Sequence, residues 1–169
     1  MTDEKLWHNA AGDELFEAGA KVVLCNRATK KVALELVRNR TNDETYYTLA
    51  GGHIDPGETS ETALRREIRE ETGLDYDGKF QLIKAQINPP TDNGRAVGRT
   101  GRKVVLIYQA EIPADTRFQP AGADVADFIL DVKWLDSTEI LSGEIQINPA
   151  YRPAILRVLK NLNGGKNDN

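Results

Sequence analysis

The residues best suited to chemistry are three glutamates in a segment that favours a helix. Residues 59–72 contain strong helix formers and neither glycine nor proline, so we expect one helix there. With about 100° between successive residues, a helical wheel separates three glutamates from three arginines, and Glu71 falls beside the apolar stripe of Leu64 and Ile68. The glutamates are Glu67, Glu70 and Glu71, and the arginines are Arg65, Arg66 and Arg69.

Three carboxylates on one side of a helix repel one another and favour a positive partner. Like charges one turn apart destabilise a helix by about 0.2–0.5 kcal/mol per pair. Mg²⁺ takes oxygen ligands and keeps water and substrate phosphates as its remaining ligands. The alternative is a solvated helix face with Glu–Arg pairs, for which Glu61 and Arg65 are correctly spaced.

The loop before this helix favours the metal interpretation. Residues 49–58 contain Gly51, Gly52 and Gly57, and glycine allows a backbone to approach a ligand closely. The start of a helix attracts phosphate oxygens, because its N–H groups are unpaired there. A glycine loop that leads into a carboxylate-bearing helix therefore indicates a site for metal and phosphate.

Together these residues resemble the Nudix box. Gly52 is followed by five residues and Glu58, then by seven residues and the segment 66–74. This corresponds to the pattern G-x5-E-x7-R-E-U-x-E-E-x-G-U, in which U is a bulky aliphatic residue, and all nine specified positions match. The resemblance implies a metal-dependent hydrolase that cleaves a pyrophosphate bond in a nucleotide-derived small molecule.

The resemblance also implies roles for individual residues. Mg²⁺ or Mn²⁺ is the expected cofactor, bound by Glu67, Glu70 and Glu71, with help from a backbone carbonyl in the region of Gly52. Arg66 belongs to the same catalytic set, where it and Glu58 orient the loop and the helix. Glu67 is one candidate for the general base that activates water.

A loop acid is the other candidate for the base. Nudix proteins often take the base or a further metal ligand from a loop after the box, and here a long loop contains Asp115, Asp124 and Asp127. We favour Asp127, which directly precedes an expected strand. All three can equally be solvated loop acids, so the choice between Glu67 and Asp127 stays open.

Substrate contacts are expected from basic residues outside the box. Arg95, Arg99 and Arg102 follow the box in a polar loop and can bind phosphate, although a solvated basic loop gives the same pattern. Arg38 and His53 are further candidates.

The resemblance leaves several substrates open. ADP-ribose or a nucleotide sugar is favoured, because Pro89 resembles a marker of the ADP-ribose pyrophosphatases of this family. A nucleoside triphosphate, including an oxidised one, is the alternative within the enzyme class. Outside that class, the domain can be a non-catalytic nucleotide sensor, although sensors are expected to have lost box glutamates. Capped RNA is a further option, which a net charge of −4 does not favour.

Composition narrows the setting of the protein. A chain of 169 residues with 28% charged residues fits one globular domain. No apolar run approaches the length of a membrane span, and the N-terminus lacks the apolar core of a signal peptide. The single cysteine, Cys25, excludes a disulfide within the chain and favours the cytoplasm. Nucleic acid is not favoured as a partner, and the family resemblance is compatible with a homodimer.

The elements that must position these residues are strands interrupted by two helices. Their order predicts an α+β domain, specifically a Nudix-type α/β/α sandwich with a mixed β-sheet. We expect one domain over residues 1–162 and a disordered tail over residues 163–169. Strands are predicted at 21–25, 31–37, 45–49, 80–87, 103–112 and 128–135, and a C-terminal helix at 149–162.

Overall fold

The computed structural model describes residues 16–39, 41–89, 102–120 and 128–164. All six expected strands and both expected helices are present, with ends that differ by a few residues. The elements, in chain order, are β1 (Glu17–Asn26), β2 (Lys31–Arg38), β3 (Thr45–Thr48), α1 (Ser60–Thr72), β4 (Gln81–Asn88), β5 (Lys103–Glu111), β6 (Ile129–Leu135), α4 (Ser137–Leu141) and α5 (Arg152–Gly164).

The strands form one mixed sheet. Its order is β3-β2-β1-β5-β4, and β6 pairs with β2 outside this path. β1 and β5 run parallel, whereas β1–β2, β2–β3, β2–β6 and β4–β5 are antiparallel. The predicted mixed sheet is therefore confirmed.

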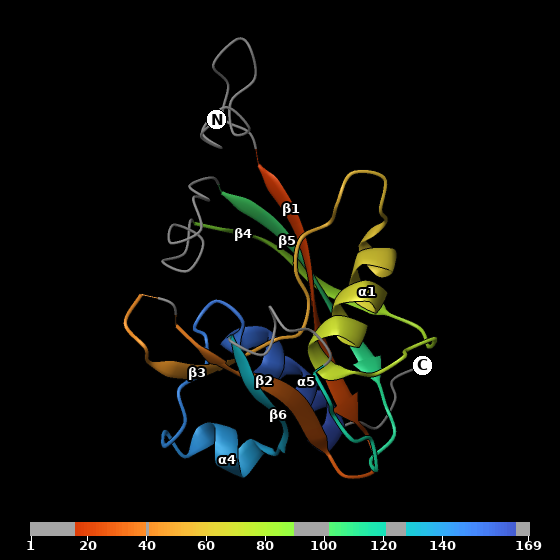
Figure 1. The fold of residues 1–169 in the computed structure, drawn as a ribbon. Helices are drawn as coiled ribbons and strands as arrows, with labels where there is room; N and C mark the ends of the chain where they lie inside the picture. Colours follow the sequence, from red (N-terminus) through yellow and green to blue (C-terminus); the bar gives the residue numbers. More distant parts are fainter. Residues whose placement is uncertain (1–15, 40, 90–101, 121–127, 165–169) are drawn as a thin grey trace.

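Helices cover both faces of this sheet, as predicted for an α/β/α sandwich (Figure 1). Alternate side chains of a strand point to opposite faces. Val23 of β1 packs in the core cluster that contains the buried residues of α5, whereas Val22 packs in the cluster that contains Leu64 and Ile68 of α1. The apolar stripe predicted for the 59–72 segment is thus the face that attaches α1 to the sheet.

β1 changes its partner along its length, and this change creates space for the glycine loop. Near its end, β1 pairs with β2, at Leu24 and Ala33 among other positions. Nearer its start, the loop takes the place of β2, because the N–H groups of Val22 and Ala20 donate to the carbonyls of Ala50 and Gly52, at 2.9 and 3.0 Å. The loop before α1 is therefore held by backbone hydrogen bonds to the centre of the sheet.

The ends of α1 follow the predicted signals. Thr59 caps the start, with its hydroxyl accepting from the N–H of Thr62, and Gly73 ends the helix in the left-handed region with φ 73°. The C-terminal helix differs from the prediction. α5 begins at Arg152 and continues through Gly164, so the first two residues of the expected disordered tail are helical. Residues 165–169 lie outside the described residues.

The short helix α4 was not predicted. Asp136 accepts from the N–H groups of Thr138 and Glu139, and the Glu139 side chain accepts from the Asp136 N–H, which is a capping box. Five residues are too few for a helical hydrophobic pattern to be visible in the sequence. In the part of the chain that the structure describes, none of the helices has the length and apolar character of a membrane span.

Candidate functional site

Arg66 ties α1 to the loop that precedes it. Its guanidinium donates to both carboxylate oxygens of Glu58, each at 2.9 Å, and to the carbonyl of His53 at 3.1 Å. A third nitrogen donates to Oε1 of Glu67 at 2.8 Å. Hydrogen bonds from Arg66, and then from the backbone N–H of Asp55, lower the pKa of Glu58 to about 2. This bidentate pairing holds the loop in a fixed orientation relative to the helix.

Glu67 lies against the glycine loop. A Cβ atom added at Gly52 would lie 2.2 Å from Oε1 of Glu67 and 2.6 Å from its carboxyl carbon. The carboxylate therefore occupies the space that any other residue at position 52 would fill. The side chain of Glu67 is only 14% exposed. Gly52 leaves the space that its carboxylate fills, and Arg66 holds the carboxylate there.

Glu71 points into the protein rather than outward. Its Oε2 accepts from the N–H of Gly51 at 2.6 Å, and its carboxyl lies near enough to that of Glu35 on β2 for each to affect the pKa of the other. Burial raises the pKa of Glu71, while the charge of Lys21 opposes this rise. Glu71, which was expected beside the apolar stripe, is thus partly buried, and the glycine loop is its hydrogen-bond partner.

Glu35 and Lys21 complete this inner part of the site. Glu35 is 1% exposed, and its Oε1 has no hydrogen-bond partner among the described residues. Burial, and then the charge of Glu71, raises the pKa of Glu35 well above its ordinary value. The ammonium of Lys21 donates to the carbonyls of Leu49, at 2.9 Å, and of Gly51.

Sequence reasoning did not identify Lys21 or Glu35 as site residues. The available signal was a charge within a run of apolar residues, because Glu35 interrupts β2 and Lys21 precedes the most apolar stretch of β1. A charged residue in a buried strand requires a partner. The partners lie in the glycine loop and on α1, which are distant in sequence.

Glu70 differs from the other two glutamates in its environment. Its side chain is 50% exposed, and its Oε2 lies 3.7 Å from a nitrogen of Arg66. Glu67, Glu70 and Glu71 therefore lie on one side of α1 but differ in how far their side chains are buried. As the side chains stand, no group of three or more His, Cys, Asp or Glu within the described residues is arranged to hold a metal ion.

The donor chemistry of this region nevertheless fits a hard divalent cation. The three glutamates supply carboxylate oxygens, and the glycine loop supplies carbonyl oxygens, which Mg²⁺ and Mn²⁺ accept as ligands. The Gly52 carbonyl accepts one backbone hydrogen bond, from Ala20, and a carbonyl oxygen has a second lone pair.

The residues predicted to bind substrate lie in separate places. His53 is in the glycine loop, where its Nε2 lies 2.8 Å from Oε2 of Glu17. Arg38 ends β2, and its Nε lies 3.7 Å from a carboxylate oxygen of Asp43. Arg102 is exposed, and its carbonyl accepts from the N–H of Glu17. Arg95, Arg99 and the candidate base Asp127 lie outside the described residues.

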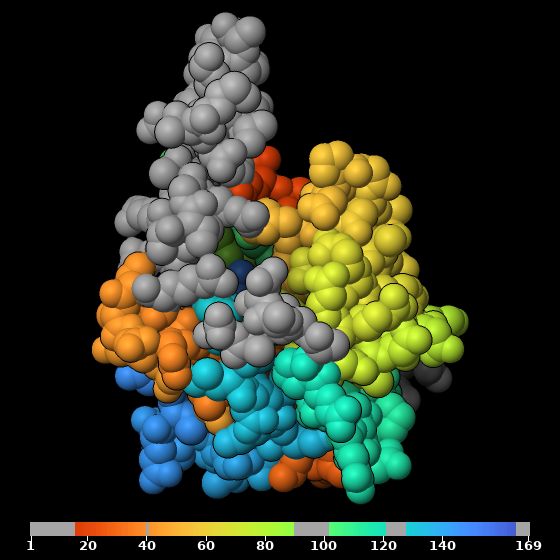
Figure 2. Space-filling view, in the orientation of Figure 1, coloured from red at the N-terminus to blue at the C-terminus, as the bar shows by residue number. Residues whose placement is uncertain are grey.

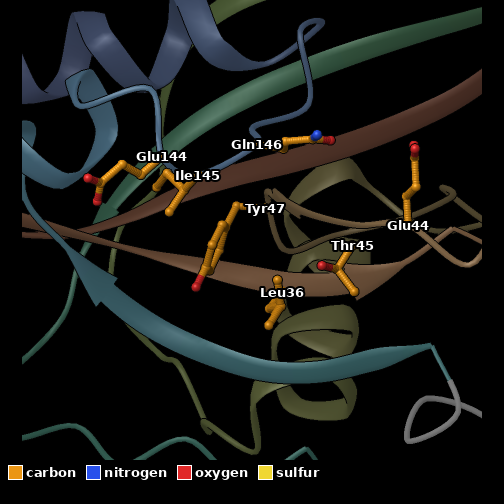
Figure 3. A pocket seen from close by; sticks show the side chains of 7 residues that line it. All are labelled: Leu36, Glu44, Thr45, Tyr47, Glu144, Ile145 and Gln146. Carbon is orange, nitrogen blue, oxygen red and sulfur yellow. The ribbon is translucent and has the colours of Figure 1, made fainter.

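A hollow in the surface borders α1 (Figure 2), whereas a separate pocket lies beside Leu36, on the face of β2 opposite to Glu35. Figure 2 shows that the hollow borders the loop before α1 and α1 itself, in orange and yellow, with green and blue atoms from later elements at its floor. The separate pocket, of about 450 Å³, is shown in Figure 3. Its walls include Leu36, which neighbours Glu35 and points to the opposite face of β2. The other lining residues are Glu44, Thr45, Tyr47, Glu144, Ile145 and Gln146.

Comparison with protein families gives one match over most of the chain. The family model described as "NUDIX domain" matches residues 15–158. This range includes the glycine loop, α1 and all six strands. The match therefore covers the sheet, α1 and part of α5, and is much longer than the 52–74 segment on which the resemblance was based.

Two kinds of curated relatives show similarity in sequence. The nucleoside triphosphatase NudI of Salmonella heidelberg is 29% identical over 127 residues, which is 74% of this chain and 86% of the relative. The NAD-capped RNA hydrolase NPY1 of Saccharomyces cerevisiae is 26% identical over 132 residues, which is 78% of this chain. The match spans only 31% of the yeast protein.

Solved structures show the same fold at low identity. The NUDIX domain of Shewanella oneidensis NrtR, complexed with ADP ribose, has a TM-score of 0.65 and 21% identity, with 96% of this chain and 99% of that chain covered. The dihydroneopterin triphosphate pyrophosphohydrolase of E. coli has a TM-score of 0.66 and 17% identity, with 86% and 98% covered.

Proposed function

Since this chain belongs to the Nudix family of hydrolases, which act on pyrophosphate bonds, we propose that it cleaves a nucleoside diphosphate linked to another moiety. ADP-ribose or a nucleotide sugar is the favoured substrate. The observation that carries this proposal is the clamp in which Arg66 holds Glu58 and Glu67 while Glu67 lies against Gly52. All four residues are specified positions of the box.

The proposed site would hold a divalent ion, Mg²⁺ or Mn²⁺, through Glu67, Glu70 and Glu71 and a backbone carbonyl in the region of Gly52. Such an ion neutralises phosphate charge and lowers the pKa of a bound water. Arg66 engages Oε1 of Glu67, so the other oxygen can accept a proton from the attacking water. Asp127 is the alternative base. Attack at phosphorus would break the anhydride bond and release two phosphate-bearing products.

Basic residues are proposed to bind the phosphates of the substrate. Arg38, His53, Arg95, Arg99 and Arg102 are the candidates. The preference for ADP-ribose is supported by Pro89 and by the ADP ribose bound to the NrtR domain that shares this fold. The similarity to NudI supports the alternative, a nucleoside triphosphate. The similarity to NPY1 keeps capped RNA as a further option.

The proposal extends to the cellular location, the partner and the oligomeric state of the protein. We infer a cytoplasmic location, since Cys25 is a buried free thiol and free thiols persist in reducing compartments. The expected partner is a nucleotide-derived small molecule; no membrane is expected, and nucleic acid is not favoured. A homodimer remains a prediction that sedimentation would test.

The test is phosphate release from a panel of substrates in the presence of Mg²⁺. ADP-ribose, nucleotide sugars, dinucleoside polyphosphates and nucleoside triphosphates would be compared. A phosphatase releases phosphate from the products of ADP-ribose and nucleotide sugars, whereas an inorganic pyrophosphatase is used for the triphosphates and chromatography for the dinucleoside polyphosphates. A variant with Glu70→Gln and Glu71→Gln serves as the control. We expect one substrate class to be cleaved by the wild type and not by this variant.

Two other outcomes would contradict the proposal. Cleavage of nucleoside triphosphates alone would replace the favoured substrate by the alternative one. Binding of nucleotides without turnover, in Mg²⁺ and in Mn²⁺, would favour a nucleotide-sensing domain.

A further inference from the structure

Two carbonyl groups of the glycine loop are already engaged by a cation of the protein itself. Lys21 lies on β1, and its ammonium donates to the carbonyls of Leu49 and Gly51. The N–H of Gly51 donates in turn to Glu71. The peptide groups on both sides of Gly51 are therefore fixed, one by Lys21 and the other by Glu71.

The backbone at Gly51 is suited to this arrangement. Its φ of +119° is one that residues other than glycine rarely adopt. A Cβ atom there would lie 2.3 Å from the carbonyl oxygen of Ala20 and 3.0 Å from Cα of Lys21. The glycine loop thus packs directly on the backbone of β1 at the residue whose side chain holds it.

Lys21 also faces the buried acidic groups of the site. Burial lowers the pKa of Lys21, but the negative charges of Glu71 and then of Glu35 outweigh this effect and leave the pKa raised. Glu35 is 1% exposed, with one carboxyl oxygen that has no hydrogen-bond partner among the described residues. A buried carboxyl in this position depends on a nearby positive charge.

We propose that Lys21 is a positioning residue of the metal site. It orders the glycine loop and balances the charge of the Glu35–Glu71 pair, and its positive charge weakens the binding of a divalent ion at Glu71 and the neighbouring loop. This inference rests on the proposed function, because it assumes that Glu71 and a loop carbonyl contribute to metal binding.

The opposing effects of Lys21 on stability and on metal affinity make the proposal testable. Lys21→Met keeps most of the side-chain length and removes the charge. We expect this variant to unfold several degrees below the wild type in EDTA, because the loop and the acidic pair lose their partner. We also expect it to bind Mn²⁺ at least about threefold more tightly, because a positive charge near the ion is removed.

Mn²⁺ affinity would be measured by the electron paramagnetic resonance signal of the free ion, and stability by thermal unfolding with and without Mn²⁺. Lys84→Met is the matched control, since Lys84 is exposed on β4, and it should resemble the wild type in both measurements. A lysine with only a structural role would lower stability and leave Mn²⁺ binding unchanged or weaker, and that result would overturn the proposal.

A second variant covers the case in which Lys21→Met does not fold in EDTA. Lys21→Met combined with Glu35→Leu removes the buried charge together with its partner, and we expect it to fold and still to bind Mn²⁺ more tightly than the wild type. Failure of both variants to fold with Mn²⁺ present would contradict the proposal. A wild type that binds no Mn²⁺ would instead overturn the proposed metal-dependent function.

Discussion

The carboxylate of Glu67 lies in the space that a side chain at position 52 would occupy, 2.2 Å from the Cβ that Gly52 lacks. This contact joins the first position of the box to a glutamate fifteen positions later in sequence. It explains in steric terms why the pattern needs a glycine before the helix. The same contact allows Gly52 to be distinguished experimentally from its neighbour Gly51.

Gly52→Ala should impair activity more than stability. The added methyl group meets the end of a flexible side chain, so Glu67 can move away at a cost of about 1 kcal/mol for its lost hydrogen bond. The displaced carboxylate would no longer be held by Arg66. We expect normal folding with a large fall in turnover, measured by thermal unfolding and by phosphate release. An alanine variant with full activity would show that the position of Glu67 is not critical.

Gly51→Ala should impair stability first. Its methyl group would lie 2.3 Å from a backbone oxygen, and its φ of +119° is strained for alanine. Strain of this kind costs about 2 kcal/mol or more, and the backbone of β1 cannot move away as a side-chain end can. Denaturant unfolding measures this loss. If Gly51→Ala were as stable as Gly52→Ala, the loop could not be packed closely on β1 at Gly51.

The pairing of Glu58 with Arg66 predicts how stability depends on pH. Since Arg66 lowers the folded-state pKa of Glu58 to about 2, the contribution of this pair is present above the unfolded-state pKa of about 4.3 and is lost as the pH falls towards 2. Glu58→Gln should therefore be less stable than the wild type at pH 7, and the difference should shrink below pH 4. A difference that is constant from pH 7 to pH 3 would rule out this ion pair as its source.

Arg66 and Arg69 provide a matched comparison on one helix. Arg66 is bonded to Glu58, Glu67 and the glycine loop, whereas Arg69 pairs with Asp75 on the surface. Lysine cannot reproduce the bidentate contact, so Arg66→Lys should lower turnover strongly. Arg69→Lys should leave turnover and stability unchanged, because exposed ion pairs contribute little. Equal effects of the two substitutions would remove the special role of Arg66.

Much of the site could be predicted from local spacing. The ends of α1 follow from Thr59 and Gly73, and the separation of glutamates from arginines follows from helical geometry. The resemblance to the Nudix box also implied that Glu58 and Arg66 orient the loop and the helix, and the two residues are in direct contact. These features depend on residues that are close in sequence or on one helix face.

The rest depends on contacts that local spacing does not encode. Lys21 donates to carbonyls that lie 28 and 30 residues away in sequence. This contact forms because β1 pairs with the glycine loop, and not with β2, near its start. Glu35 on β2 comes near Glu71 because α1 packs on β1, the strand beside β2. The sequence shows both as charges in apolar strands, without indicating which partners they find.

We propose above that the glutamates on the inner side of α1 carry out hydrolysis. The most direct test compares turnover by the wild type, Glu67→Gln and Arg69→Gln at saturating Mg²⁺, with the substrate that the panel identifies. Glutamine preserves the shape of Glu67 but cannot bind a metal ion as a carboxylate or accept a proton. We predict that Glu67→Gln lowers turnover by about 100-fold or more, while Arg69→Gln stays within about twofold of the wild type, as expected for an exposed residue. Near-normal turnover by a folded Glu67→Gln variant would contradict the account.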